Sequence, residues 1–289
     1  MIEDTSILVT GGSGAFGQAF ARYAVALPNP PKRLVIYSRG EYRQFLMSQE
    51  LKPIDYTGCT RFLIGDVRDR TRLREVITGF GIDTVVHAAA LKRIEVGKYN
   101  PTEMKKTNID GAENLIEAAR GSRVKKVVFL SSDKAFEPIS PYGISKAMAE
   151  SLFLEANNTT GWDGPKFSIC RYGNVWASTG SVVPVWKASV LNGKPIEVTD
   201  PECTRFFMYM HEAIDLVLRT FATMKGGEIN VPTLPAYRVG DLVQAIGATD
   251  VKLKGLPDYE KLHESMAKGN SSDKARRMSV DELKKELAA

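Results

Sequence analysis

Five polar side chains between residues 132 and 146 have the types and spacing of an acid–base redox site: Ser132, Asp133, Lys134, Tyr142 and Lys146. Tyr142 and Lys146 are four residues apart, so on a helix they share one face. A tyrosine is a poor base at neutral pH, but a neighbouring ammonium and a cationic cofactor ring both favour its phenolate. Tyr142 can then take the proton of an alcohol while hydride leaves the carbon. The alternative is a chance occurrence of the pair on an ordinary helix.

A glycine-rich turn near the start of the chain could hold the phosphates of a dinucleotide. Residues 10–17 read TGGSGAFG, directly after an apolar strand and directly before a helix-like stretch. The glycines permit a tight turn, close approach of the backbone to a pyrophosphate, and close packing of helix on sheet, while the helix N-terminus supplies amide donors. A glycine turn without a ligand is the alternative. The predicted cofactor contacts here are Gly11, Ser13, Gly14, Ala15, Phe16 and Gly17.

The end of the second predicted strand favours NADP over NAD. An NAD-binding protein normally has an acid there for the ribose 2′-hydroxyl, whereas this chain has Ser38 and Arg39, with Arg43 one turn later. A hydroxyl and planar guanidinium donors suit a 2′-phosphate, and the guanidinium keeps its charge. The alternative is that both arginines are ordinary solvated charges.

Two further strand ends complete the predicted cofactor site. Asp66 and Val67 follow the third strand, where a carboxylate could accept a hydrogen bond from the adenine amino group. Ala88, Ala89 and Ala90 end the fourth strand, and their small side chains leave room for the sugar and phosphates. Plain small-residue packing explains the alanines nearly as well.

Strands and helices must alternate along the first part of the chain to position these residues. Short apolar runs with β-branched residues, separated by helix-like stretches, predict about six parallel strands covered on both faces, a doubly wound α/β sheet. After Asn174 the regular alternation of strands and helices ends, and the predicted elements become shorter. We therefore expect a Rossmann domain over residues 1–174, to which parts of 205–232 return, and a smaller substrate-binding lobe over 175–289. The predicted strands lie at 6–10, 34–38, 60–66, 84–90, 125–132 and 166–174, with helices at 16–27, 41–51, 70–80, 108–120, 142–157 and 210–224.

Composition excludes several other classes of protein. The chain has 289 residues, 43% of them hydrophobic, which is enough for a sizeable core. It begins without a secretory pattern and has no long apolar run, so we expect a cytoplasmic protein without a membrane segment. The net charge of +5 comes from basic residues interleaved with acids, which fits an anionic small ligand and not a nucleic acid. Three widely spaced cysteines, without nearby histidines, predict neither disulfides nor a metal site.

Beyond these features, the sequence resembles the extended short-chain dehydrogenase/reductases, and among them the inverting UDP-N-acetylglucosamine 4,6-dehydratases. The resemblance covers most of the chain to about Glu264, and the SDK, PYGISK and AALK stretches are specific to that subfamily. The resembling stretches are TGGSGAFG, VIYSRGE, FLIGDVRD, HAAALKRIEVGKYNPTE, KTNIDGAENL, LSSDKAFEPISPYGISK, RYGNV, GSVVP, TRFFM, GGEINVP and EKLHE.

The resemblance implies a role for the acid and lysine that simple epimerases lack. Once Tyr142 and NADP have oxidised C4 of the sugar, the C5 proton becomes acidic. Lys134 would take that proton, provided that burial and Lys146 lower its pKa, and Asp133, kept protonated, would donate to the leaving C6 hydroxyl. Hydride then returns to C6, so the tightly held NADP is regenerated, and a proton delivered to the opposite face of C5 would invert the sugar.

The resemblance also extends the site and implies a homo-oligomer. It carries Asn108 to the cofactor, Lys92 to both cofactor and substrate, and Asn174, Val183, Pro184 and Arg205 to the nucleotide sugar, beside Lys134 and Tyr142. The chain departs from the family pattern before Glu260, where relatives have an arginine, so other nucleotides stay open. Two other functions remain: a nucleotide-sugar C4 epimerase or reductase, and a non-catalytic NADP sensor or scaffold.

Overall fold

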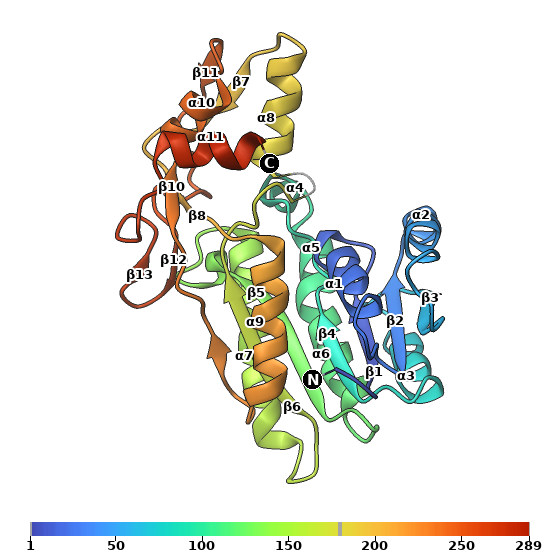
Figure 1. Cartoon of the computed structure of the whole chain (residues 1–289). Coiled ribbons are helices and arrows are strands. Elements are labelled where there is room, and N and C mark those ends of the chain that lie inside the picture. Colours follow the sequence, from blue (N-terminus) through green and yellow to red (C-terminus); the bar gives the residue numbers. More distant parts are fainter. Residues whose placement is uncertain (1, 179–180, 289) are drawn as a thin grey trace.

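A seven-stranded parallel sheet forms the body of the protein (Figure 1). The computed structural model describes residues 2–178 and 181–288. The inner strands are buried along most of their length, as expected for a parallel sheet covered on both faces, whereas the two edge strands are partly exposed. Their order is β3-β2-β1-β4-β5-β6-β9. The bounds are β1 Ser6–Thr10, β2 Arg33–Ser38, β3 Thr60–Ile64, β4 Thr84–His87, β5 Lys126–Ser132, β6 Lys166–Tyr172 and β9 Ile229–Asn230.

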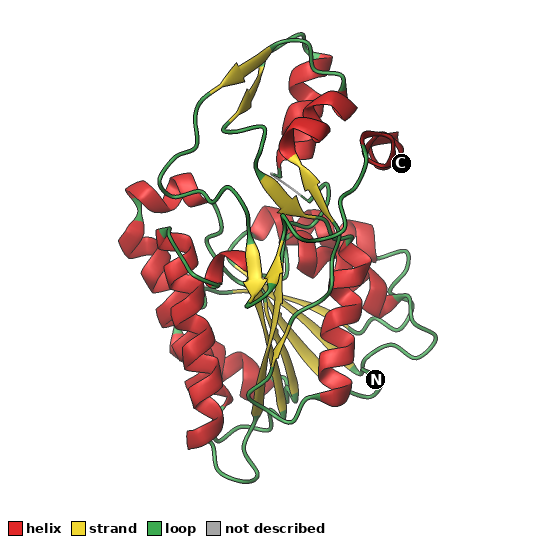
Figure 2. Ribbon diagram, turned by 90° about the vertical axis from the view of Figure 1, so that its left-hand side faces the viewer, coloured by secondary structure: helices red, strands yellow, loops and turns green. Residues whose placement is uncertain are grey.

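Helices cover both faces of this sheet, and each layer buries its own apolar cluster (Figure 2). One face packs against α1, α2 and α9, through side chains such as Phe20, Met47 and Val217. The other packs against α3, α6 and α7, through Leu73, Leu115 and Phe153. The bounds are α1 Ala15–Val25, α2 Glu41–Leu51, α3 Arg70–Gly79, α6 Gly111–Ala119, α7 Pro141–Thr159 and α9 Met210–Thr223.

The strand order reverses at β1, which lies between β2 and β4. In open α/β sheets this switch point leaves a crevice at the carboxyl ends of the strands, where ligands bind. The glycine turn follows β1 and the three alanines follow β4, so the topology places both beside that crevice. The prediction of a doubly wound α/β fold is confirmed.

A smaller group of elements lies beyond the carboxyl edge of the sheet (Figure 1). Its two-stranded sheets pair β7 with β11 in parallel, and β8 with β10 and β12 with β13 in antiparallel fashion. A third apolar cluster, which includes Trp186, Phe207 and Leu242, holds it together. The bounds are β7 Ile196–Val198, β8 Thr204–Phe206, β10 Ala236–Arg238, β11 Val251–Leu253, β12 Ser265–Ala267, β13 Asn270–Ser271, α8 Val182–Leu191, α10 Val239–Ile246 and α11 Val280–Ala288.

The region after β4 differs most from the expected elements. β4 ends at His87, so Ala88 to Ala90 belong to the following loop. The short helices α4, Ile94–Tyr99, and α5, Pro101–Lys105, come next. The helix predicted at 108–120 is instead a π-helix at Lys106–Asp110 continued by α6. Pattern alone does not reveal a π-turn, because the extra residue shifts the helical period only locally.

The division into a domain of residues 1–174 and a lobe of 175–289 stays a prediction, although β9 does add residues 229–230 to the sheet beside β6. Within the described ranges, no helix combines the length and apolar character needed to cross a membrane.

Candidate active site

The glycine turn after β1 has little room for any side chain. Gly11 has a φ of +67°, and a Cβ built on it would lie 2.7 Å from the Cα of Ala89. Gly14 caps α1, and its amide donates to the carbonyl of Gly11 at 2.9 Å. A Cβ on Gly17 would collide with the backbone of Gly12, so α1 packs closely on the turn. The N-terminus of α1 therefore faces the crevice, with Ser13, Ala15 and Phe16 beside it.

The residues predicted for the 2′-phosphate gather at the end of β2. Gln44 donates to the Ser38 hydroxyl at 2.9 Å, and Arg39 and Arg43 are both exposed. Asp66 lies 3.8 Å from Arg39. Arg68 donates two hydrogen bonds to one Asp66 oxygen, at 2.9 and 2.7 Å. The structure thus brings these residues together, and an adenine amino group would share Asp66 with Arg68.

Burial alone would raise the pKa of Asp66, but the hydrogen bonds and charge of Arg68, with the charge of Arg39, outweigh it and lower the pKa. The carboxylate form is therefore favoured. Val67, the next residue, is buried with the apolar cluster under α3 and α6.

Asn108 fixes the loop that follows the three alanines. Its side chain accepts from the amide of Leu91 at 2.8 Å, and donates to the carbonyl of Leu91 at 3.0 Å and to Ser145 at 2.9 Å. The π-helix around it is the kind of distortion often found at functional sites. Lys92 follows directly, and desolvation together with the charge of Arg93 lowers its pKa. Asn108 thus ties the loop bearing Lys92 to α7.

Lys134 lies between two buried carboxylates at the carboxyl end of β5. Its ammonium is 3.1 Å from Asp133 Oδ1 and 3.2 Å from Glu264 Oε1. Ser132 donates to the same Asp133 oxygen at 2.8 Å. The side chains of Asp133 and Glu264 are 1% and 2% exposed, whereas that of Lys134 is 20% exposed. Lys134 is therefore the member of this group that an incoming ligand can cover.

Two oxygens of the group have no hydrogen-bond partner among the described residues, although both are buried. They are Oδ2 of Asp133 and Oε2 of Glu264. Buried polar atoms are normally hydrogen-bonded, so two such oxygens beside one ammonium point to groups that bond to a ligand.

The expected lowering of the Lys134 pKa is wrong. Burial does act in that direction, but the charges of Asp133 and Glu264 outweigh it and raise the pKa above the ordinary lysine value. Lys146 is the lysine whose pKa falls, to about 7, because it is buried and Glu150 compensates only in part. The sequence-based expectation failed because Glu264, which lies far along the chain, was not placed beside Lys134.

Tyr142 and Lys146 lie on α7, whose first turn is capped by Ser140 through a 3.1 Å hydrogen bond from the Gly143 amide. Both side chains are buried. Burial raises the pKa of Tyr142, against the charge of Lys134 and a hydrogen bond with Ser132. Among the described residues, the ammonium that favours the phenolate is that of Lys134.

The substrate residues predicted from the family resemblance fall into two groups. Asn174 and Val183 line one small pocket with Trp176 and Tyr237, and the buried Oδ1 of Asn174 has no partner in the described part of the chain. Pro184 is the next residue of α8. Arg205 is buried and ion-paired with Glu260 at 2.5 Å.

Arg205 interacts electrostatically with the group of Lys134 and Glu264. Burial would lower its pKa, but Glu264 and Glu260 outweigh this and raise it. Tyr237 lies on the neighbouring strand β10. Burial raises its pKa to about 12 and outweighs the charges of Arg205 and Lys134, which act to lower it. The structure thus brings Arg205 close to the proposed catalytic residues.

Sequence reasoning missed Glu264 and the buried ion pair of Glu150 with Arg171. Arg171 donates to the two Glu150 oxygens at 2.9 and 2.5 Å, and to the carbonyl of Met266 at 2.6 Å. The only sequence signal for Glu264 was its place in the EKLHE stretch. A single acid in a polar loop belongs to no hydrophobic pattern from which its burial could be predicted.

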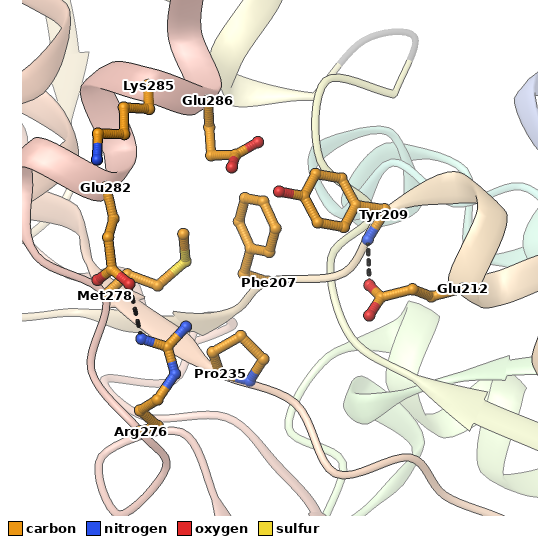
Figure 3. A pocket seen from close by; sticks show the side chains of 9 residues that line it. All are labelled: Phe207, Tyr209, Glu212, Pro235, Arg276, Met278, Glu282, Lys285 and Glu286. Atoms are coloured by element: carbon orange, nitrogen blue, oxygen red, sulfur yellow. Dashed lines mark hydrogen bonds and ion pairs between the residues drawn. The ribbon is translucent and has the colours of Figure 1, made fainter. Parts of the chain in front are cut away.

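A second pocket lies on the smaller group of elements, between the start of α9 and α11 (Figure 3). Tyr209, Glu286 and the ion pair of Arg276 with Glu282 face it. The substrate residues predicted from the sequence do not line it. It shares the lining residue Phe207 with the pocket of Asn174.

Comparison with known proteins identifies the family. Residues 7–284 match the family described as polysaccharide biosynthesis protein. The chain is 42% identical over 275 residues to a UDP-N-acetylglucosamine 4,6-dehydratase (inverting) of Campylobacter jejuni subsp. jejuni serotype O:23/36, covering 94% of this chain and 80% of that one. It is 34% identical over 282 residues to a UDP-glucose 4-epimerase of Rickettsia akari, covering 95% and 81%.

Solved structures agree in fold. Pen from Bacillus thuringiensis superposes with a TM-score of 0.92 at 31% identity, covering 99% of both chains. The dTDP-glucose 4,6-dehydratase DesIV from Streptomyces venezuelae, solved with NAD bound, superposes with a TM-score of 0.82 at 22% identity, covering 98% of this chain and 96% of that one. The second likeness shows the fold alone. The chain belongs to the polysaccharide biosynthesis protein family, in which its relatives include the inverting UDP-N-acetylglucosamine 4,6-dehydratases.

Proposed function

We propose that this protein is an NADP-dependent nucleotide-sugar 4,6-dehydratase that acts on UDP-N-acetylglucosamine and inverts C5. The observation that carries the proposal is the buried group of Asp133, Lys134 and Tyr142 at the carboxyl edge of the sheet, with Lys146 one turn along α7. The activity of the Campylobacter jejuni relative, at 42% identity, supports it.

The crevice residues fit a dinucleotide. A side chain at Gly11 would fill the space against Ala89, and the N-terminus of α1 suits a pyrophosphate. Ser38 and Arg39 stand where an NAD-binding protein normally has an acid, and together with Arg43 they support NADP over NAD. A cofactor held there would supply the hydride acceptor for C4 and the hydride donor for C6.

Oxidation at C4 needs a base for the hydroxyl proton. Tyr142 takes that proton, because the charge of Lys134 and the hydrogen bond with Ser132 both favour its phenolate. Lys146, which donates to the carbonyl of Leu130, would hold the sugar side of the cofactor beside Tyr142. The resulting ketone makes the C5 proton acidic.

Elimination of water needs a base at C5 and an acid at C6. Lys134 takes the C5 proton with its free electron pair, and Asp133 donates a proton from its unpartnered Oδ2 to the departing C6 hydroxyl. After hydride has returned to C6, a proton returns to C5. No external redox partner is required.

In this proposal residues 1–174 hold the cofactor, and the smaller lobe mainly binds the nucleotide sugar. Lys92 and Arg205 supply positive charge for the diphosphate, and Asn174, Val183 and Pro184 shape the substrate pocket. A homo-oligomer and a cytoplasmic location remain predictions.

A C4 epimerase is the second candidate, favoured by the 34% identity to the Rickettsia akari protein. The pair of Asp133 with Lys134 argues against a C4 epimerase, because epimerisation at C4 needs no acid at C6. Incubation with UDP-N-acetylglucosamine and catalytic NADP separates the two. A dehydratase gives a product lighter by one water without net NADPH, whereas an epimerase leaves the mass unchanged.

A further inference from the structure

Glu264 is held rigidly against the Lys134 ammonium by bonds on both sides of it in the sequence. Its backbone amide donates to the Ser272 hydroxyl at 2.9 Å. Just before it, Lys261 donates to the carbonyl of Phe136 at 2.6 Å; just after it, Arg171 donates to the carbonyl of Met266 at 2.6 Å. These bonds hold the backbone of the segment at the end of β5, and the Glu264 side chain, 2% exposed, lies against the Lys134 ammonium.

The proposed elimination sets a proton requirement that Lys134 does not meet by itself. To take the C5 proton its nitrogen must be neutral, yet its two carboxylate neighbours favour the ammonium. In this scheme Asp133 has already taken a proton from solvent at its unpartnered Oδ2, for use at the C6 hydroxyl, so it does not also accept the one on Lys134. Glu264, at 3.2 Å, is the remaining carboxylate in contact with the ammonium among the described residues.

We propose that Glu264 is a positioning residue for dehydration, which accepts the Lys134 proton at Oε1 when substrate covers the pair. The proposal rests on the proposed function. The N–H bond of Lys134 breaks, its electron pair stays on nitrogen, and an O–H bond forms on Glu264. Lys134 then takes the C5 proton while Asp133 gives its own to the C6 hydroxyl, so charge and protons balance.

Covering the site supplies the driving force for this transfer. The Lys134 side chain is 20% exposed and Glu264 is 2% exposed, so a bound sugar removes the remaining water from the ammonium alone. Desolvation disfavours the charged forms of both Lys134 and Glu264, so it lowers the free energy of the neutral pair relative to the ion pair. The other groups that face Lys134 are Asp133 beside it, Arg205 from β8, Tyr142 from α7 and Tyr237 from β10.

The first test uses the wild-type protein with NADP and UDP-N-acetylglucosamine in deuterated buffer. Deuterium entry at C5 is followed by mass spectrometry from about pH 6 to about pH 9, a range that spans the working region of a general base. Because the proton acceptor lies inside the protein, the rate should stay nearly flat. A rate that climbs tenfold per pH unit would show that bulk solvent deprotonates Lys134 and would overturn the proposal.

The second test compares Glu264→Gln with Glu228→Gln. The Glu228 carboxylate also accepts a hydrogen bond within the protein, from Ser168. It lies just before β9, at the amino end of that strand and therefore away from the carboxyl ends where Lys134 lies. We expect Glu264→Gln to bind NADP and to pass hydride from C4 at close to the wild-type rate. C5 exchange should be about 100-fold slower at neutral pH and should recover as the pH rises. Glu228→Gln should match wild type, and Glu264→Asp should regain part of the lost exchange.

The outcomes separate this proposal from its alternatives. Exchange as fast as wild type, or faster, at neutral pH would make Glu264 a mere counter-ion, and slow exchange without recovery at high pH would make it only structural. Either result would overturn the proposal. Failure of the wild-type protein to release water would instead overturn the proposed function.

Discussion

The ammonium of Lys146 donates a 2.6 Å hydrogen bond to the carbonyl of Leu130, the last apolar residue of β5. It also lies 3.8 Å from the centroid of the Phe129 ring, and the side chain is buried. This contact fixes the lysine one helical turn from Tyr142 and ties α7 to the strand that carries Asp133 and Lys134. Burial of the charge has a measurable cost in stability.

Replacement of Lys146 by methionine should stabilise the protein at neutral pH. The folded pKa of Lys146 is about 7 against an ordinary value of 10.5, so the unfolded chain binds more protons between these values. The lysine therefore lowers the stability of the fold below about pH 7, and the loss is recovered as the pH rises towards 10.5.

The free energy of unfolding, measured in urea at several pH values, should rise less steeply with pH in Lys146→Met than in wild type over this range. The variant should also lose oxidation at C4. A variant that is less stable than wild type at pH 7, with an unchanged pH slope, would contradict the assignment.

Replacement of Lys134 by alanine should keep NADP binding but slow dehydration by at least about 100-fold, because the C5 base is lost. The two buried carboxylates would also lose their counter-ion, which should destabilise the fold by about 3 kcal/mol. Product mass and thermal unfolding measure these effects. Lys268→Ala, at an exposed lysine between β12 and β13, is the control. Unimpaired turnover in Lys134→Ala would remove this residue from the mechanism.

Combined replacement of Arg39 and Arg43 by alanine should weaken NADP binding by about 10-fold to 100-fold and leave NAD binding nearly unchanged, because only NADP carries the 2′-phosphate. Isothermal titration calorimetry of both cofactors measures this difference. Arg74→Ala, at an exposed arginine of α3, should change neither affinity. An equal loss for both cofactors would show that the arginines do not read the 2′-phosphate.

Gly11→Ala should destabilise the protein more than Gly58→Ala. Both glycines have a positive φ, +67° and +62°, so each substitution has a similar conformational cost, about 1 kcal/mol. Only the Cβ at position 11 meets other atoms, 2.7 Å from the Cα of Ala89, whereas nothing lies within 4 Å at position 58. Thermal unfolding and NADP titration compare the variants, and equal losses at the two positions would argue against a crowded cofactor turn.

The sheet and its helices could be predicted because each element carries its own signal. Ser6–Thr10 and Glu41–Leu51 agree with the predicted bounds, since the glycine after β1 and the glycine before α2 each mark one end of the element. The paired strands β7 with β11 and β8 with β10 could not be predicted. They are three residues long, too short to show a period, and their partners are distant in sequence.

The candidate site could be predicted in its parts but not in its electrostatics. The sequence placed Asp133, Lys134 and Tyr142 together because a strand end and a helix start fix them locally. The raised pKa of Lys134 could not be predicted, because it depends on Glu264, which long-range contacts place beside it.

The path of hydride tests the central claim most directly. UDP-N-acetylglucosamine labelled with deuterium at C4 is incubated with the protein and NADP, and the product is examined by NMR. The account predicts that the deuterium appears in the C6 methyl group of a 4-keto product. Deuterium that stays at C4, or that accumulates on the cofactor, would contradict it.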